Sequence, residues 1–221
     1  MIVGFSEITI EVPDLATAID DYQCFLGADA GKFSPLRNVG IRLREAPLIE
    51  AAQITALGLF SDSDTDGMPD TRQRGLVLPV ATQRSVLTGD EATAHGICAV
   101  DHIVLMTRDA DDCIRLFGDE GLGLRLALDQ LVPEWGGRML FFRCGKMTLE
   151  VIHNLDDPPQ QDAFWGITYL CENLDLTLQS LGRADVEHSE ARQGRKPGTR
   201  VATIKSHNLG LPTLLIEPAQ A

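Results

Sequence analysis

Two ionisable side chains, His102 and Glu150, lie on predicted strands where they could transfer protons. The segment AVDHIVLMT alternates as a strand and places His102 on one face with three apolar residues, Val100, Val104 and Met106. The later segment MTLEVIH is a second predicted strand and contains Glu150. An imidazole paired with a carboxylate can act as a general acid and base. His102 and Glu150 are therefore the candidate catalytic residues.

These two strands belong to a structural unit that occurs twice in the chain. The first copy spans residues 99–153 and the second about 164–218. Each copy opens with an apolar alternating run, continues with an acidic start and a short amphipathic stretch, and closes with three short strand-like runs. A repeat of this size indicates two half-sheets that bury each other's faces. The paired half-sheets can enclose a cleft, and polar residues that face it become site candidates.

At the segments DHIVLMTRDADDCIRLFGDEGLGL and GKMTLEVIH the chain resembles the vicinal oxygen chelate superfamily, which includes glyoxalases, epimerases, bleomycin-resistance proteins and ring-cleaving dioxygenases. The resemblance covers residues 99–218 and rests on the order strand, helix, three strands, given twice. It implies an α+β fold in which repeated βαβββ modules form a curved, cleft-enclosing mixed sheet. It says less about the reaction, because the family hosts many chemistries.

Metal-using members of this family draw one ligand from the first strand and one from the last strand of each unit. By position, His102 and Glu150 match these ligands in the first unit. The second unit departs from the pattern, since Gly166 and Leu215 stand at the expected positions. Glu217, two residues further on, could supply a third ligand if it reaches inward. An imidazole with carboxylates suits Zn, Fe, Mn, Ni or Co.

Three functions are compatible with this pattern. The first is a metal-dependent lyase, isomerase or ring-cleaving dioxygenase that uses His102, Glu150 and Glu217. The second is a metal-free enzyme in which Glu150 is the general base and His102 its partner. The third is a metal-free binding or sequestering protein of the bleomycin-resistance type. In each case Glu150 needs a partner, because an unpaired buried carboxylate is costly.

Cationic and aromatic residues in two predicted loops could bind an anionic substrate group. Arg195, Lys196 and Arg200 lie in the loop ARQGRKPGTR. Trp135 and Arg138 lie in the equivalent loop of the first unit, VPEWGGR. Arginine can hold a carboxylate or phosphate in a bidentate way. The alternative is a solvated hairpin, with Trp135 covering the core.

The remaining candidate residues for lining the cleft lie on the first strand of each unit. They are Val104, Met106 and Thr168. Trp165 flanks Gly166, and strand alternation predicts that it points to the opposite face and packs in the core.

Composition and charge predict a soluble, cytoplasmic protein that acts on a small molecule. The chain has 221 residues, a formal net charge of -13 and no apolar run long enough to span a membrane. The negative charge argues against nucleic acid and anionic membrane surfaces as partners. Five scattered cysteines indicate free thiols. A homodimer is the default assembly.

The N-terminal third looks like a reduced version of the same architecture. We expect a reduced domain at residues 1–81, a polar connector at 82–98 and the complete paired-module domain at 99–221. Glu7 occupies the position that matches His102. An acidic turn nearby, DSDTDGMPD, matches the first half of a calcium loop but lacks the second half. Its candidate calcium ligands are Asp62, Asp64, Asp66 and Asp70.

Overall fold

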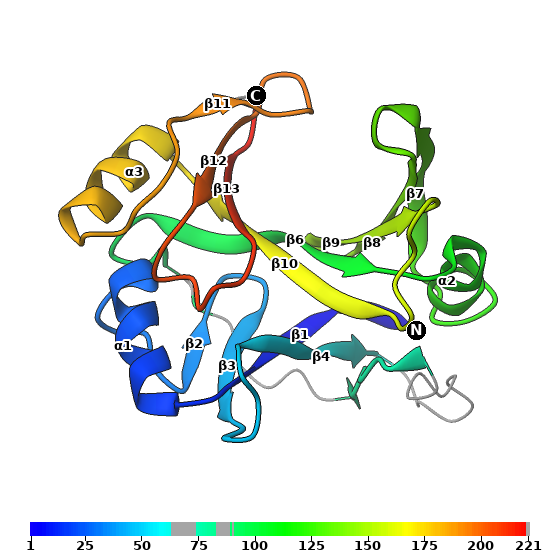
Figure 1. The fold of residues 1–221 in the computed structure, drawn as a ribbon, viewed down its shortest axis with the longest axis horizontal. Helices are drawn as coiled ribbons and strands as arrows, with labels where there is room; N and C mark the ends of the chain where they lie inside the picture. The colour runs from blue at the N-terminus through cyan, green and yellow to red at the C-terminus, as the bar shows by residue number, and fades with distance from the viewer. Residues whose placement is uncertain (63–73, 83–88, 90, 220–221) are drawn as a thin grey trace.

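The computed structural model describes residues 1–62, 74–82, 89 and 91–219. Within these residues the strands form one five-stranded and one eight-stranded sheet (Figure 1). In sheet order, the first contains β2 (Phe33–Pro35), β3 (Gly40–Glu45), β1 (Ile2–Val12), β4 (Gln53–Ser61) and β5 (Val80–Ala81). The second contains β11 (Arg192–Gln193), β12 (Arg200–Ile204), β13 (Thr213–Glu217), β10 (Ala163–Cys171), β6 (Ile97–Met106), β9 (Met147–Asn154), β8 (Gly137–Cys144) and β7 (Arg125–Val132).

The second sheet contains the repeated unit that the sequence predicts. The first copy is β6, α2 (Ala110–Phe117), β7, β8 and β9, and the second is β10, α3 (Leu174–Arg183), β11, β12 and β13. β6 pairs antiparallel with β10, and each pairs in parallel with the last strand of its own unit. In Figure 1 the two ends of this sheet, β11–β13 and β7–β8, rise on either side of the central strands. The predicted α+β fold of βαβββ modules is confirmed.

Each α-helix begins at a residue whose side chain caps it. The side chains of Asp14, Asp109 and Asn173 each accept a hydrogen bond from the backbone N–H three residues later. Asp14 precedes α1 (Leu15–Leu26), which ends at Gly27. A short 3₁₀-helix at Pro133–Trp135 joins β7 to β8.

One hydrophobic core lies between the two sheets. Tyr22 and Phe25 of α1 meet Tyr169 of β10, with the two tyrosine hydroxyls 3.2 Å apart. The rings of Phe25 and Tyr169 pack edge to face at 5.2 Å between centroids. Because these residues are fully buried, the N-terminal sheet covers the outer face of β10 and holds it in place.

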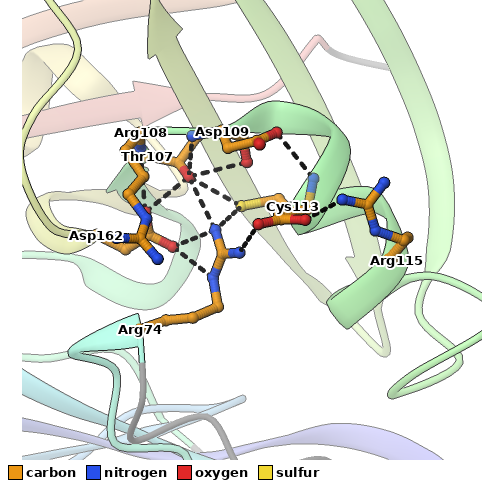
Figure 2. Close-up of polar contacts among 8 residues, drawn as sticks. Arg74, Thr107, Arg108, Asp109, Cys113, Arg115 and Asp162 are labelled. Carbon is orange, nitrogen blue, oxygen red and sulfur yellow. Dashed lines mark hydrogen bonds and ion pairs between the residues drawn. The ribbon is translucent and has the colours of Figure 1, made fainter.

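A buried ion pair also joins the two halves of the chain (Figure 2). Arg74, which precedes β5, donates to the carboxylate of Asp162 at the start of β10, with one N–O distance of 2.6 Å. The other oxygen of Asp162 accepts from the Thr107 hydroxyl at 2.8 Å and from the Arg108 backbone N–H at 3.0 Å. This network fixes the junctions β6–α2 and β9–β10 relative to the N-terminal half.

Candidate active site

A cavity of about 710 Å³ lies on the concave face of the eight-stranded sheet. Residues of both repeated units line it, from β6, β8 and β9 on one side and from β10, β12 and β13 on the other. His102 and Glu150 both line this cavity. The structure therefore brings together two side chains that lie 48 residues apart in the sequence. The register explains this, because His102 pairs with Thr148 and Glu150 with Val104.

His102 lies at the centre of a network of polar contacts with three other residues. Its Nε2 atom is 3.1 Å from Oε2 of Glu150 and 2.8 Å from the hydroxyl oxygen of Thr168. Its Nδ1 atom is 2.8 Å from Oδ2 of Asp101. The side chains of His102 and Glu150 are only 19% and 13% exposed. Because Nδ1 contacts Asp101, the imidazole is oriented so that Nε2 faces Glu150.

The network requires a proton between His102 and Glu150. Asp101 is an acceptor, so Nδ1 of His102 donates to it. Nε2 of a neutral imidazole would then carry a lone pair toward the Glu150 carboxylate, which also carries only lone pairs. The contact at 3.1 Å is favourable only if a proton resides on Nε2 or on Glu150. These two groups thus form a pair that can hold and release one proton.

The surroundings shift the pKa values of both carboxylates. Burial raises the pKa of Glu150 above its ordinary value of 4.5, and the positive charges of His102 and Arg195 only partly oppose this. Burial also acts to raise the pKa of Asp101. The hydrogen bond from His102 and the nearby Arg143 and Lys196 outweigh it, so that this pKa is lowered. Of the two carboxylates, Glu150 is thus the better proton acceptor.

Asp101 was missed by strand alternation because it lies in a β-bulge. On β10, Thr168 and Tyr169 are consecutive, but they pair with His102 and Val100, which leaves Asp101 as the extra residue. A bulge turns two neighbouring side chains toward the same side of a sheet. Asp101 consequently lines the cavity beside His102. The prediction that Val100 shares the face of His102 is wrong, because the bulge turns Val100 into the core.

A second bulge corrects the prediction for Trp165. Phe164 and Gly166 pair with the consecutive residues Leu105 and Val104, so Trp165 is the extra residue on β10. Its side chain lines the cavity and is 52% exposed, rather than packing in the core. Asp101 on β6 and Trp165 on β10 hold equivalent positions in the two units, and both side chains line the cavity.

Glu217 does not reach the cavity. It lies on the opposite face of β13, where its carboxylate accepts a hydrogen bond from the Leu174 N–H at 2.6 Å and caps α3. Its neighbours Leu214 and Ile216 face the cavity instead. The prediction that Glu217 is a third metal ligand is therefore wrong, because strand alternation directs it to the helix.

The donor set does not fit a three-ligand metal centre. Asp101 and Glu150 contact different nitrogens of His102, so only one of these carboxylates can share an ion with a given ring nitrogen. Across the described part of the chain, no group of three or more His, Cys, Asp or Glu side chains could hold a metal ion. A catalytic zinc site usually has three protein ligands. His102 and Glu150 provide two.

The predicted cationic residues fall on two different faces of the sheet. Arg195 and Lys196 line the cavity. Arg200 instead forms a bidentate ion pair with Asp175 of α3, at 2.7 and 2.8 Å. Arg138 likewise points away from the cavity and binds Asp129 and Asp111. The predictions for Arg200 and Arg138 are wrong, because strand alternation directs both side chains toward the helices.

Arg192 of β11, which belongs to the predicted cationic loop, also lines the cavity. So does Arg143 of β8, which was not singled out in the sequence. Arg143 lies two residues after Phe141 on the cavity-facing side of β8, a pattern that alternation along FFRC could have revealed.

The other predicted lining residues are mostly found in the cavity wall. Val104, Thr168 and Trp135 line it. Met106, the last residue of β6, does not line it. All five cysteines are free thiols, as predicted, and four of them are buried.

The N-terminal sheet has a position equivalent to His102. Glu7 of β1 pairs with β3 and β4 as His102 pairs with β9 and β10. By the same register, Arg42 stands where Glu150 stands in the second sheet, and its Nε donates to Glu7 at 2.7 Å. A guanidinium keeps its protons at all ordinary pH values. The ion pair therefore cannot exchange a proton, although Glu7 lines a second cavity of about 550 Å³.

The predicted calcium ligands fall largely outside the described residues. Asp64, Asp66 and Asp70 are not among the described residues. Asp62 is described, and its carboxylate pairs with the terminal ammonium group of Met1 at 2.8 Å. None of the helices in the described residues is long and apolar enough to span a membrane.

Comparisons with known proteins agree with this architecture. Residues 101–203 match a family model described as the Glyoxalase/Bleomycin resistance protein/Dioxygenase superfamily. A mutant 4-hydroxymandelate synthase from Streptomyces coelicolor has a similar structure, with a TM-score of 0.72 and 13% identity over 100% of this chain and 94% of that one. Methylmalonyl-CoA epimerase from Mycobacterium tuberculosis matches with a TM-score of 0.49 and 18% identity, over 59% of this chain and 95% of that one. No curated protein sequence matches the chain.

Proposed function

We propose that this chain, whose residues 101–203 match the Glyoxalase/Bleomycin resistance protein/Dioxygenase superfamily, is an enzyme that moves a proton on a small molecule in the large cavity. The reaction class is isomerase or lyase. The observation that carries the proposal is the contact of 3.1 Å between Nε2 of His102 and Oε2 of Glu150, with Asp101 on the other ring nitrogen.

The chemistry that this pair supports is the conversion of a carbonyl compound to its enol. Glu150, ionised and with a raised pKa, takes the proton from the carbon next to the carbonyl as the C–H bond breaks. His102, protonated at Nε2, gives its proton to the carbonyl oxygen. Asp101 keeps the imidazole in the orientation that both transfers need. Return of a proton to carbon completes an isomerisation, and loss of a neighbouring group completes an elimination.

Deuterium exchange tests this proposal without knowledge of the natural substrate. The wild-type protein is incubated in D₂O with a panel of carbonyl compounds that have acidic C–H groups, including phenylpyruvate, and exchange is followed by ¹H NMR. We expect exchange above the buffer rate for at least one compound, and its loss in His102→Ala. The matched control is His153→Ala, since His153 does not line the cavity.

Exchange that persists in His102→Ala would contradict the proposal. The proposal would also be contradicted if the wild-type protein exchanged none of the compounds faster than buffer does. If these compounds nevertheless bind in the cavity, the protein is the binding or sequestering type instead.

The proposed chemistry needs no metal ion. Superfamily members commonly use a divalent metal, but among the described residues no group of three or more His, Cys, Asp or Glu side chains could hold a metal ion. We therefore expect that removal of metal ions with EDTA, followed by gel filtration, leaves the exchange rate unchanged. The measurement is the same NMR assay, with elemental analysis before and after chelation. Loss of exchange that returns on addition of Zn, Fe, Mn, Ni or Co would favour the metal-dependent alternative.

A further inference from the structure

We propose that the large cavity is built for a dianionic small molecule with an apolar body, either a dicarboxylate or a phosphate ester. Its acidic group is held by an anion subsite made of Arg143, Arg192, Arg195 and Lys196. If the proposed function holds, this molecule is the substrate. The binding of the anion itself does not depend on the proposed function.

The charge balance of the cavity wall is opposite to that of the whole chain. Four cationic side chains line the cavity against two carboxylates, Asp101 and Glu150, and the proton shared by His102 and Glu150 offsets one of these negative charges, which leaves a net excess of positive charge. The chain as a whole carries a formal charge of -13. Positive charge concentrated in a cleft attracts an anionic ligand and raises its local concentration. This excess of positive charge can balance a dianion.

The four cations of the anion subsite have no ionic partner within the described residues. None of them lies within 4.0 Å of a carboxylate oxygen there. On the opposite face of the same sheet, by contrast, Arg138 and Arg200 are each held by aspartates at 2.7–2.8 Å. The outward-facing arginines are thus engaged in the fold, whereas those of the cavity remain available to a ligand.

A closed turn directs two of these cations over the cavity. Thr199 donates to the Lys196 carbonyl through its hydroxyl at 2.6 Å and through its N–H at 3.1 Å. The Gly194 N–H donates to the Thr199 carbonyl at 2.9 Å. Because these bonds fix the turn, it presents Arg195 and Lys196 in a defined orientation.

Arg195 extends across the cavity to the opposite half-sheet. Its Nη1 atom lies 3.9 Å from Sδ of Met139 on β8. Arg143 also comes from β8, on the same side as Met139. Cations therefore approach from both half-sheets. A planar guanidinium from each side can hold the oxygens of one acidic group.

The rest of the wall suits an apolar ligand body. Trp135, Phe141 and Trp165 line the cavity together with Met139 and Ile152. Small-molecule sites are typically apolar, with a few polar groups that fix orientation. A ligand with its acidic group at the anion subsite and an apolar group against these rings would satisfy both parts of the wall.

Both tryptophans of the chain line this cavity, so intrinsic fluorescence reports its occupancy. The test titrates the protein at pH 8 with phenyl phosphate, phenylmalonate and uncharged phenol. We expect at least one of the two anions to bind at least about tenfold more tightly than phenol, and the tighter one identifies the acidic group. Its affinity should fall about 10–100-fold in the double variant Arg195→Gln/Lys196→Gln. It should also weaken with added salt, whereas phenol binding should not.

The matched control is Arg200→Gln, which removes one positive charge next to the same turn but outside the cavity. We expect it to bind the anions like the wild type. Three results would overturn the proposal: phenol binds as tightly as both anions, the double variant keeps the wild-type affinity, or Arg200→Gln weakens binding as much as the double variant does.

His102→Ala separates this proposal from the proton-transfer function. It should lose deuterium exchange but still bind the anions. If the wild type binds the anions without catalysing exchange, the enzymatic proposal fails and the anion subsite remains. If it catalyses exchange but prefers phenol, the anion subsite fails and the proton-transfer function remains.

Discussion

Replacing Asp162 with alanine is expected to lower the free energy of unfolding by about 3–5 kcal/mol, the range found when one partner of a buried ion pair is removed. The Asp162 side chain is completely buried, and that of Arg74 is 12% exposed. The substitution leaves the Arg74 guanidinium without its main partner. It also removes the acceptor of the Arg108 N–H and the shorter of the two hydrogen bonds that the Thr107 hydroxyl donates (Figure 2). Each of these losses carries its own desolvation cost.

Equilibrium unfolding in urea, followed by circular dichroism, measures this effect. Asp175→Ala is the matched control, because Asp175 also holds an arginine but lies at the surface. It should unfold close to the wild-type midpoint, since exposed ion pairs contribute little to stability. If Asp162→Ala unfolded like Asp175→Ala, the ion pair to Arg74 would not be what joins the two halves of the chain.

The architecture and the centre of the site could be predicted because they depend on simple periodicities. Alternation along AVDHIVLMT and MTLEVIH identified two strands, and the repeat indicated how they would be paired. Parallel pairing of β6 with β9 then brings His102 and Glu150 into contact. Alternation also directs residues correctly wherever a strand is regular, as it does for Glu150 and Val104.

The errors arise where the strands are irregular. The bulges at Asp101 and Trp165 each shift the alternation by one residue, and nothing in the local sequence marks either of them. Asp101 was missed for this reason, although it fixes the orientation of His102. A bulge depends on how two strands pair, and pairing is a property of the folded sheet.

Other errors come from residues whose charge suggested a role in the cavity. Glu217, Arg138 and Arg200 were chosen for their chemical type, yet all three face the helices. In the case of Glu217, the error came from matching Leu215 with Glu150. The register of β10 with β13 puts Leu214 at that position, whereas Leu215 lies in the core and Glu217 shares its side of the strand. Chemical type alone therefore predicts a site less well than the parity of the strand that carries the residue.

Glu150→Gln is expected to reduce the exchange rate about 10²–10⁴-fold, the range typical of losing a general acid or base. Glutamine keeps the size of the side chain but cannot accept the substrate proton. Because burial raises the pKa of Glu150, the wild-type rate should fall with decreasing pH at a value above the ordinary 4.5. A pH–rate profile of the NMR assay measures this. A variant with wild-type activity would exclude Glu150 as the base.

The same substitution is expected to stabilise the protein at neutral pH. With a raised pKa in the folded state, Glu150 binds its proton more tightly when folded than when unfolded. Below pH 4.5 it is protonated in both states, and its ionisation costs nothing. As the pH rises from 4.5 to the higher pKa of the folded state, Glu150 ionises in the unfolded state but stays protonated in the folded state. The wild type therefore loses stability relative to Glu150→Gln over this interval. Urea unfolding at pH 4 and pH 8 should therefore show an advantage of the variant that appears only at pH 8. A variant that is less stable at pH 8 would mean that the contacts of Glu150 with His102 and Arg195 outweigh its burial. Glu150 would then be a structural partner of His102 and not a base whose pKa is raised by burial.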